Sequence, residues 1–494
     1  ITPVLNQIRT GRAGGSPESR GAVRIVSTSM SFATHVLPVR GQTCLTFCSD
    51  ITSPKGAAVN VLMVVAEMAP FATSGGLGDA ITGIAHALGR IDVNVTVLMP
   101  RYQSLSDLGE ARPGEGPARA LYQHHEAGVR ILFVDDPESF DRPGIYGPEP
   151  GSAFEDEWRR WGRFCRVAGA LSGQFDIVHL HDAQTAPAAL LSSSPTVLTL
   201  HNAAYSVQGP LEESVALFAD HPKAIDLFEW YGTANYLKAG ILAADQVTTV
   251  SSGYARQIAE DPEVSSGLNE FVAGLTSPVV GILNGIEIRR FDPETDEAIP
   301  VPFGPDDLTG RAVAREELVA RTGLDGSGIL FGMVGRMTGQ KGLELLYPII
   351  DQLIAQGFRL VAVGNGDQDY LVDEWAARAP GAVWHGPYTE ELARLVWAGG
   401  DSFLMPSRFE PGGLGNLYAM RYGAPPVVRR TGGLASTVID LADDSAAANG
   451  FGFVDYTPEA LQEAVERAMT VYRERPDVWA SLQRAGMTAD WGWD

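Results

Sequence analysis

The sequence predicts an α/β protein made of two Rossmann-like domains that face a cleft. Short apolar, β-branched runs alternate with helix-length patterns from Val59 onward, which is typical of parallel sheets with helices on both faces. A stretch rich in Pro and Asp at 291–310 interrupts this alternation. A chain of 494 residues is long enough for two or three domains. We therefore expect an N-terminal domain at 59–295 and a C-terminal domain at 296–494.

The expected strands follow from the apolar runs. In the first domain they are 59–67, 93–100, 129–135, 176–181, 196–202, 246–252 and 279–286. In the second domain they are 328–336, 358–366, 382–388, 401–407, 425–430 and 450–455. Helical patterns lie between them, for example at Leu343–Gly357. Open parallel sheets bind ligands beyond the carboxyl ends of their strands, so the residues just after each strand are the first candidates for a site.

The composition excludes several classes of protein. A net charge of −23 argues against nucleic acid or an anionic membrane as the main partner. Only Cys44, Cys48 and Cys165 are present, which excludes a disulfide scaffold and paired metal-type Cys clusters. Apolar runs such as Val61–Val65 are too short to span a bilayer. We expect a cytoplasmic protein, and no sequence feature predicts its oligomeric state.

The first 58 residues differ from the rest. They carry six basic residues against Glu18 and Asp50, and they show little hydrophobic periodicity. Such a basic leader is compatible with an organelle address, which would imply a plastid, with an extended reading frame, or with a poorly ordered tail without function. We expect this leader to contribute nothing to the fold.

The first motif is "TSGGLGDA" at 73–80. Gly75 and Gly76 allow a close backbone approach to a ligand, and a helix expected to begin near Asp79 would offer free N–H groups to an anion. However, Ile81 stands where a dinucleotide fingerprint needs its third glycine, and no P-loop is present. The motif alone is equally compatible with a plain strand-to-helix turn.

The second motif is "VGRMTGQKGLELL" at 334–346. Gly335 and Arg336 follow a predicted strand, and Lys341 lies at the start of a helical pattern. A guanidinium that can bind two oxygens and a compact ammonium together suit a diphosphate. The alternative is a pair of surface cations that cap a loop.

The third motif is "MPSRFEPGGLGNLYAMRYGAPPVVRRTGGL" at 405–434. Glu410 follows a strand, and Gly412 and Gly413 precede a helical pattern that begins at Leu414. A carboxylate and exposed backbone N–H groups in one pocket suit the hydroxyls of a sugar. The alternative is a Gly-rich turn with an exposed Glu, although a second glycine pair at 432–433 makes that less probable. We expect the Glu410 and Lys341 side chains to be accessible to solvent.

Three histidines end two neighbouring strands. His179 and His181 alternate along one strand, and His201-Asn202 ends the next. No acidic ligand recurs at metal spacing, so a metal site is disfavoured. A histidine at a strand end is better interpreted as a hydrogen-bonding residue of the site.

These motifs, with "AEMAPFATSGGLGD", "HLHDAQ", "TLHNAAYSVQG" and "GILNGIE" in order, resemble the bacterial glycogen synthase and plant starch synthase family. The resemblance covers about Asn60 to Asp494. It implies the GT-B fold and a retaining glucosyltransferase that moves glucose from ADP-glucose to the non-reducing 4-OH of an α-1,4-glucan. It also implies that no cofactor or metal ion is needed. The partners would be a nucleotide sugar and an α-glucan.

The resemblance also implies roles for individual residues. The catalytic residues would be His201, Arg336, Lys341 and Glu410. The donor would contact Thr73, Gly75, Gly76, Asp79, Gly335, Tyr388, Gly412, Gly413 and Leu414. The acceptor or cleft residues would be Glu67, Asp182, Asn202, Tyr205 and Asn284. We expect a front-face displacement, in which the departing phosphate oxygen takes the proton of the acceptor.

The chain departs from the family pattern at several positions. Thr73 stands where the family has a lysine, and a neutral hydroxyl cannot replace an ammonium beside a phosphate. Gly412 and Gly415 stand where Cys and Thr are usual, and no tryptophan follows Asp182. The sequence ends at "DWGWD", where the family continues through a last helix, so we expect that helix to be truncated.

Two other functions stay open at this point. Thr73 favours a related retaining glycosyltransferase with another nucleotide-sugar donor. The second alternative is a weakly active homologue that binds glucan or regulates a synthase, although the retained His201, Arg336, Lys341 and Glu410 speak against it. A nicotinamide oxidoreductase is disfavoured because the chain lacks G-x-G-x-x-G and the acidic residue that should follow it.

Overall fold

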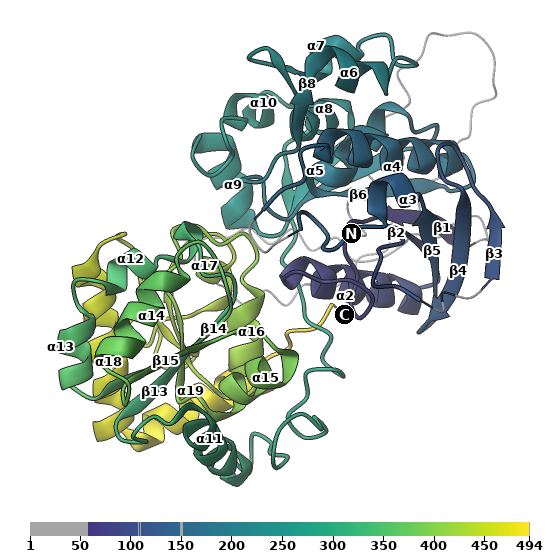
Figure 1. Cartoon of the computed structure of the whole chain (residues 1–494). Coiled ribbons are helices and arrows are strands. Elements are labelled where there is room, and N and C mark those ends of the chain that lie inside the picture. Colours follow the sequence, from purple (N-terminus) through teal and green to yellow (C-terminus); the bar gives the residue numbers. More distant parts are fainter. Residues whose placement is uncertain (1–57, 107, 109, 149–151, 494) are drawn as a thin grey trace, which may run out of the picture. The chain divides into compact units, whose positions relative to one another are not determined.

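The computed structural model describes residues 58–106, 108, 110–148 and 152–493. Residues from Val59 onward belong to one unit, and Figure 1 shows its helices and strands. Apart from Ala58, the predicted leader lies outside the described residues, as does the final Asp494.

The first sheet has nine strands and is mainly parallel. Its strands in spatial order are β12 (Val280–Gly281), β11 (Gln246–Thr249), β7 (Thr196–Leu200), β6 (Ile177–His181), β1 (Val59–Val64), β2 (Val93–Pro100), β5 (Val129–Asp135), β4 (Ala120–Glu126) and β3 (Glu110–Pro113). β4 and β3 are antiparallel and close one edge. The strand order reverses at β1, since β2 and β6 pair with its two sides.

Helices and a small antiparallel sheet accompany the first sheet. The helices are α2 (Gly76–Arg90), α3 (Pro137–Phe140), α4 (Glu157–Ser172), α5 (Asp182–Thr185), the 3₁₀ helix η1 (Ala186–Leu190), α6 (Leu211–Ala216), α7 (Ala224–Phe228), α8 (Tyr236–Ala243), α9 (Ser252–Glu260) and α10 (Asn269–Ala273). The small sheet consists of β8 (Gln208–Pro210), β10 (Thr233–Asn235) and β9 (Glu229–Trp230).

The second sheet has six strands, all parallel. In spatial order they are β15 (Val383–Gly386), β14 (Phe358–Val363), β13 (Ile329–Val334), β16 (Ser402–Met405), β17 (Pro426–Arg429) and β18 (Phe451–Phe453). Its helices are α11 (Thr309–Thr322), η2 (Gly339–Lys341), α12 (Leu343–Leu346), α13 (Ile350–Ala355), α14 (Asp369–Arg378), α15 (Glu390–Gly399), α16 (Leu414–Arg421), α17 (Leu434–Thr437), α18 (Pro458–Glu474) and α19 (Pro476–Thr488).

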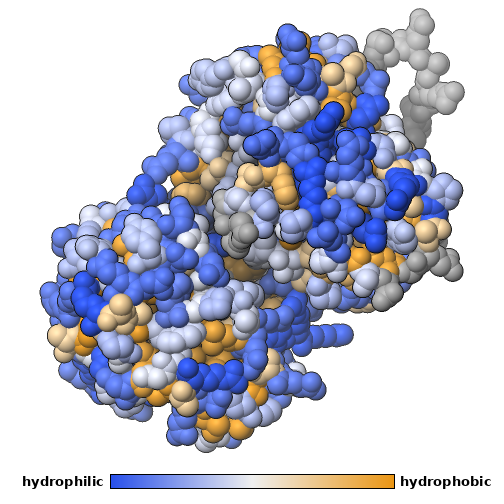
Figure 2. All heavy atoms as spheres, viewed as in Figure 1, coloured by the Kyte–Doolittle hydropathy of each residue, from blue (hydrophilic) through white to orange (hydrophobic). Residues whose placement is uncertain are grey.

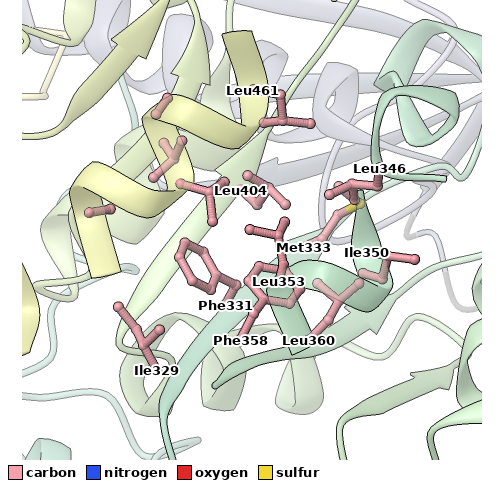
Figure 3. Close-up of a cluster of buried hydrophobic side chains, with 14 of the residues drawn as sticks. Ile329, Phe331, Met333, Leu346, Ile350, Leu353, Phe358, Leu360, Leu404 and Leu461 are labelled. Atoms are coloured by element: carbon pink, nitrogen blue, oxygen red, sulfur yellow. The ribbon is translucent and has the colours of Figure 1, made fainter. Parts of the chain in front are cut away.

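The core explains why these strands are continuously apolar. Phe331 and Leu404 belong to one buried cluster with Leu461 of α18 (Figure 3). Their strand neighbours Leu330 and Phe403 belong to a second buried cluster. Alternate residues of one strand therefore fill two cores, one on each face of the sheet, as expected of a parallel sheet covered on both sides.

The structure confirms the predicted α/β class and finds a strand within each of the thirteen predicted ranges. Three details were wrong. The helix expected near Asp79 begins at Gly76, and the helix expected at Leu343–Gly357 is split into α12 and α13, because Pro348 cannot donate an intrahelical hydrogen bond. The antiparallel edge, β3 and β4, was not predicted.

The predicted boundary at 295/296 falls between the last strand of the first sheet and the first strand of the second. It stays a prediction. Among the described helices, none is long and apolar enough to cross a membrane. The face shown in Figure 2 is mainly hydrophilic, with scattered hydrophobic residues.

Candidate functional site

The predicted residues of the first sheet follow the carboxyl ends of three adjacent strands. Glu67 follows β1, Asp182 follows β6, and His201 with Asn202 follows β7. The strand order reverses at β1, and such a switch point is where open α/β sheets bind ligands. Adjacent parallel strands thus gather residues from distant parts of the sequence at one edge.

Glu67 is buried and holds the glycine loop in place. Its carboxylate accepts hydrogen bonds from the Ser74 backbone N–H at 2.5 Å, from Ser74 Oγ–H at 2.8 Å and from the hydroxyl of Tyr146. Burial raises the pKa of Glu67, although these hydrogen bonds and the charge of Arg336 oppose that shift. Glu67 was predicted to line the acceptor cleft. In the structure its side chain ties the Ser74 loop to Tyr146.

The loop at 73–76 is exposed to solvent. A Cβ added to Gly75 would meet nothing within 4 Å, whereas one on Gly76 would lie 3.2 Å from Leu414 of the second sheet's helix α16. The methyl group of Thr73 covers Gly78, where a Cβ would come within 2.5 Å of it. The space next to Gly75 is therefore free, and Thr73 lies at the exposed edge of the loop.

Asp182 has a strained backbone and a displaced pKa. Its φ angle is +57°, which costs a non-glycine residue about 1–3 kcal/mol. In return, its carboxylate accepts the backbone N–H groups of His201 at 2.6 Å and Asn202 at 3.1 Å. Burial raises the pKa of Asp182 to about 7 despite these bonds. Asp182 therefore fixes the chain on which His201 lies, and strain of this kind is concentrated at functional sites.

The three histidines form a buried row of rings. His179 and His181 have ring centroids 4.1 Å apart, and His181 and His201 lie 5.2 Å apart. His181 Nδ1 is hydrogen-bonded to His201 Nε2 at 3.0 Å. Burial lowers the pKa of His179 and of His201 to about 3 and that of His181 well below its usual value. All three rings are therefore neutral at neutral pH.

The hydrogen bond between His181 and His201 fixes the tautomer of both rings. His181 Nε2 is buried without a hydrogen-bond partner. If His201 were the donor, His181 would carry its proton on that Nε2 and leave a buried N–H unpaired, which is rare and costly. We therefore assign the donor to His181 Nδ1–H. His201 then carries its own proton on Nδ1, which can be donated to a ligand.

The predicted residues of the second sheet surround a pocket. The pocket is lined by Gly335, Arg336 and Lys341, which follow β13, and by Ser407, which follows β16. The strand order of the second sheet reverses between these two strands. The Arg336 side chain is exposed and forms no hydrogen bond or ion pair with another described residue. Its guanidinium is thus free to bind an anion.

Glu410 is bound by its neighbours. Its carboxylate accepts a hydrogen bond from Lys341 Nζ at 2.7 Å and one from Ser407 Oγ at 2.9 Å. The prediction that Glu410 is accessible to solvent was wrong, since the residue is 8% exposed. Lys341 is only partly exposed. The pocket therefore joins one free guanidinium to an ammonium that is positioned by a buried carboxylate.

The two glycine pairs of the third motif pack against each other. A Cβ on Gly433 would lie 2.4 Å from the carbonyl oxygen of Gly412, and one on Gly432 would lie 2.0 Å from that of Glu410. Gly413 has φ of +70° and stands just before α16, which begins at Leu414 as predicted. Only glycine allows this approach of two backbones, and the approach holds Glu410 in place.

Several contacts join residues that follow strands of the two sheets around this pocket. The Arg336 guanidinium lies 4.9 Å from the ring centroid of Tyr205, and Asn202 Nδ2 donates to Gln340 Oε1 at 3.3 Å. A Cβ on Gly412 would lie 2.9 Å from Asn284 Nδ2. Predicted acceptor and donor residues are therefore neighbours.

Two predicted donor residues belong to a separate group. Asp79 accepts a hydrogen bond from Arg290 at 3.0 Å and one from Tyr418, and burial raises the pKa of Asp79. Tyr388 is 52% exposed. The structure thus gives Asp79 an ion-pair role. Among the described residues, no hydrogen bond or ion pair joins Asp79 or Tyr388 to the residues that line the pocket.

The sequence did not single out Tyr146, Ser407 and Gln340. Ser407 and Gln340 lie within or beside motifs, three residues before Glu410 and one before Lys341, so a closer look at the polar neighbours could have found them. Tyr146 lies in a loop without a motif and reaches Glu67 across 79 positions. Across the described ranges, no group of three or more His, Cys, Asp or Glu side chains is arranged to hold a metal ion.

Comparisons with known proteins identify the family of this chain. Residues 60–273 match the family "Starch synthase catalytic domain" and residues 314–481 match "Glycosyl transferases group 1". Glycogen synthase of Syntrophotalea carbinolica is 37% identical over 88% of this chain and 96% of its own length, and that of Novosphingobium aromaticivorans is 38% identical over the same shares.

Solved structures show the same fold. The catalytic domain of starch synthase IV from Arabidopsis thaliana, bound to ADP and acarbose, is 27% identical, with a TM-score of 0.78 over 89% of this chain and 97% of its own. A sucrose-phosphate synthase from Thermosynechococcus elongatus is 16% identical, with a TM-score of 0.56 over 88% and 95%, and shares the GT-B fold alone. The chain belongs to the glycogen and starch synthase family and is a glycosyltransferase of that type.

Proposed function

We propose that this protein transfers glucose from ADP-glucose to the non-reducing 4-OH of an α-1,4-glucan, with retention of configuration. The bond between the anomeric carbon and the phosphate oxygen breaks, and a bond to the acceptor O4 forms on the same face. The proton of the acceptor hydroxyl passes to the departing phosphate oxygen, and ADP leaves. The pocket at Arg336 and Lys341 is the observation that carries this proposal.

The cations of the second sheet would stabilise the leaving ADP. Negative charge grows on the phosphate as the glycosidic bond stretches, and fixed cations at that point lower the barrier more than they strengthen ground-state binding. Arg336 is free to bind two phosphate oxygens, and Lys341 is held by Glu410 at 2.7 Å. A cationic pair can do here what a divalent metal does in other enzymes, so we propose that the reaction needs no metal ion.

The first sheet would bind the transferred sugar and the acceptor. A sugar is neutral, and its hydroxyls require donors and acceptors in fixed places rather than charge. His201 offers Nδ1–H as a donor because His181 holds its other nitrogen, and Asn202 lies beside it. Tyr205, which packs against Arg336, links the two groups.

The donor identity rests partly on Thr73. The family resemblance implies a lysine at this position, and an ammonium at the exposed edge of the glycine loop would add charge to the donor site. We propose that Arg336 and Lys341 hold ADP-glucose without it and that the affinity for the donor is correspondingly weak.

Transfer of labelled glucose from ADP-, UDP- and GDP-glucose to glycogen tests this proposal, with wild type and Thr73→Lys in parallel. We expect transfer from ADP-glucose by wild type, a lower donor KM for Thr73→Lys, and no loss of activity in EDTA. Thr73→Met, which lengthens the side chain at the same position but adds no charge, is the matched control.

Two results would contradict the proposal. Exclusive use of a donor other than ADP-glucose would favour the related glycosyltransferase. Glycogen binding without release of any nucleoside diphosphate would favour the glucan-binding homologue.

A further inference from the structure

A tight turn between β9 and β10 presents an exposed aromatic side chain. Tyr231 is 87% exposed, the highest value among the large hydrophobic side chains that the structure describes. Its ring lies against Trp230, with centroids 4.8 Å apart and planes at 76°, and Trp230 in turn contacts Phe271 at 5.8 Å. We call Tyr231 and Trp230 the aromatic turn.

The backbone of this turn favours a different residue at position 231. Tyr231 has φ of +47° and Gly232 has φ of +85°, between strands paired at Trp230 and Thr233. A two-residue hairpin turn with both φ values positive prefers Asn-Gly or Asp-Gly, and a bulky residue there is strained. The sequence therefore carries a strained tyrosine whose ring contributes little buried surface to the fold.

The aromatic turn is connected to the candidate site through one short segment. A Cβ on Gly267 would lie 3.3 Å from the Trp230 ring. Next to it, Ser266 has φ of +51° and donates from Oγ to the carbonyl oxygen of Ala204 at 2.9 Å. Ala204 precedes Tyr205, which packs against Arg336. A second strained residue thus ties the aromatic turn to the predicted acceptor residues.

The chemistry of this surface fits a neutral, extended ligand with apolar faces. Aromatic side chains bury about 150–250 Å² each, so these two rings cannot supply the roughly 800 Å² per partner of a stable protein interface. A tyrosine offers a rigid apolar face and a polar hydroxyl, which matches the C–H face and the hydroxyl rim of a glucose ring. The net charge of −23 disfavours an anionic ligand.

We propose that the aromatic turn is a second glucan-binding site, on which sugar rings of a long α-glucan stack while its non-reducing end lies near Tyr205. This inference rests on the proposed function, because it takes the acceptor to be an α-glucan. It adds a site for the polymer beyond the reacting end. Long acceptors would gain affinity from the second contact, whereas short ones would not reach it.

The test compares full-length wild type with Tyr231→Ala, Tyr231→Asn and Tyr370→Ala. Tyr370 is also an exposed tyrosine, at 59%, but it lies on α14 beside the second sheet and serves as the matched control. Dissociation constants for glycogen come from electrophoresis in gels with and without glycogen. The ratio of KM for glycogen to KM for maltotriose comes from transfer assays.

We expect both Tyr231 variants to bind glycogen about fivefold more weakly, with a similar rise in the KM ratio, and Tyr370→Ala to match wild type. Tyr231→Asn should also raise Tm by about 1–2 °C, since asparagine suits the turn. A lower Tm for Tyr231→Asn would overturn the inference, because the ring would then support the fold.

Other outcomes separate the two proposals. Unchanged glycogen affinity and KM ratio in both Tyr231 variants, with active wild type, would overturn the second site alone. A change in oligomeric mass on Tyr231→Ala would also overturn it, because the turn would then bind a second copy of the chain. Absence of transfer by wild type would contradict the proposed function, and the gel measurement would still decide on the second site.

Discussion

The two sheets end in two groups of residues that differ in charge: one group is neutral and the other is ionic. The residues after β1, β6 and β7 are buried side chains whose pKa values are displaced toward the neutral form, and they are tied to one another by hydrogen bonds. The residues after β13 and β16 include a free guanidinium at Arg336 and an ion pair of Lys341 and Glu410 at 2.7 Å. One group suits hydroxyls and the other suits phosphates.

This difference explains how one site handles a ligand that is half neutral and half anionic. A nucleotide sugar needs strong charge on its diphosphate and precise but uncharged contacts on its sugar. A cation among the sugar contacts would carry a desolvation cost without a charged partner, whereas neutral donors alone would stabilise a leaving diphosphate poorly. Each sheet supplies one of the two environments.

The largest expected effect comes from the charged group. Lys341→Ala removes a cation from the position where charge develops and should lower kcat about 10²–10³-fold, as should Arg336→Ala. Arg336→Lys should recover part of the loss, because it restores the charge but not the forked geometry. Steady-state kinetics with ADP-glucose measure this. Arg378→Ala, which removes a surface cation paired with Asp351, is the control, and losses below tenfold in both site variants would contradict the comparison.

Substitutions in the neutral group should lower activity less, because they remove a hydrogen bond between uncharged groups. His201→Ala should lower kcat/KM about tenfold to a hundredfold through loss of one hydrogen bond, and His181→Asn, which can still donate near the position of Nδ1, should lose less than His181→Ala. Because burial lowers the pKa of His201 to about 3, the ring stays neutral from pH 5 to 9. A rate limb near pH 6.5 that disappears in His201→Gln would contradict this.

The pH dependence of stability is a third way to test the neutral group. The pKa of Asp182 is raised to about 7 in the fold from about 3.9 in the unfolded chain. Between these values the native state keeps a proton that the unfolded state has released, so this residue's contribution to stability is complete below pH 4 and falls as pH rises to 7.

Asp182→Asn keeps an acceptor for the His201 N–H but cannot ionise. Its free energy of unfolding, measured by urea at pH 4.5 and 6.5, should fall less than that of wild type, by about 1 kcal/mol per pH unit. Equal changes in both proteins would show that Asp182 is ionised in the fold.

The smallest expected effect is that of salt. An increase of ionic strength from about 0.05 to 0.5 M shortens the Debye length to a few ångströms. The donor KM should rise about twofold to fivefold, since Arg336 is exposed to solvent, whereas the KM for maltotriose should stay constant. A parallel rise of both KM values would contradict the view that only the donor is bound by charge.

The sequence predicted the two sheets well because their strands are continuous apolar runs, such as Ile329–Val334, that fill a core on each face. It also singled out Arg336, Lys341, Glu410 and His201 as candidate site residues, since each follows such a strand, and their catalytic roles stay predictions. It did not predict that Glu410 is buried, because the glycine pairs that enclose it meet only in the folded chain. Nor could it find Tyr146. Its hydrogen-bond partner Glu67 is 79 positions away in the sequence, and no local pattern connects the two residues.

The most direct test of the division of labour is the affinity for ADP alone, measured by titration calorimetry. ADP contains the diphosphate but not the transferred sugar. The structure predicts that Lys341→Ala and Arg336→Ala each weaken ADP binding about tenfold or more, while His201→Gln binds ADP as wild type does. Weaker ADP binding by His201→Gln, with unchanged binding by both cation variants, would contradict the assignment of phosphate to the second sheet and sugar to the first.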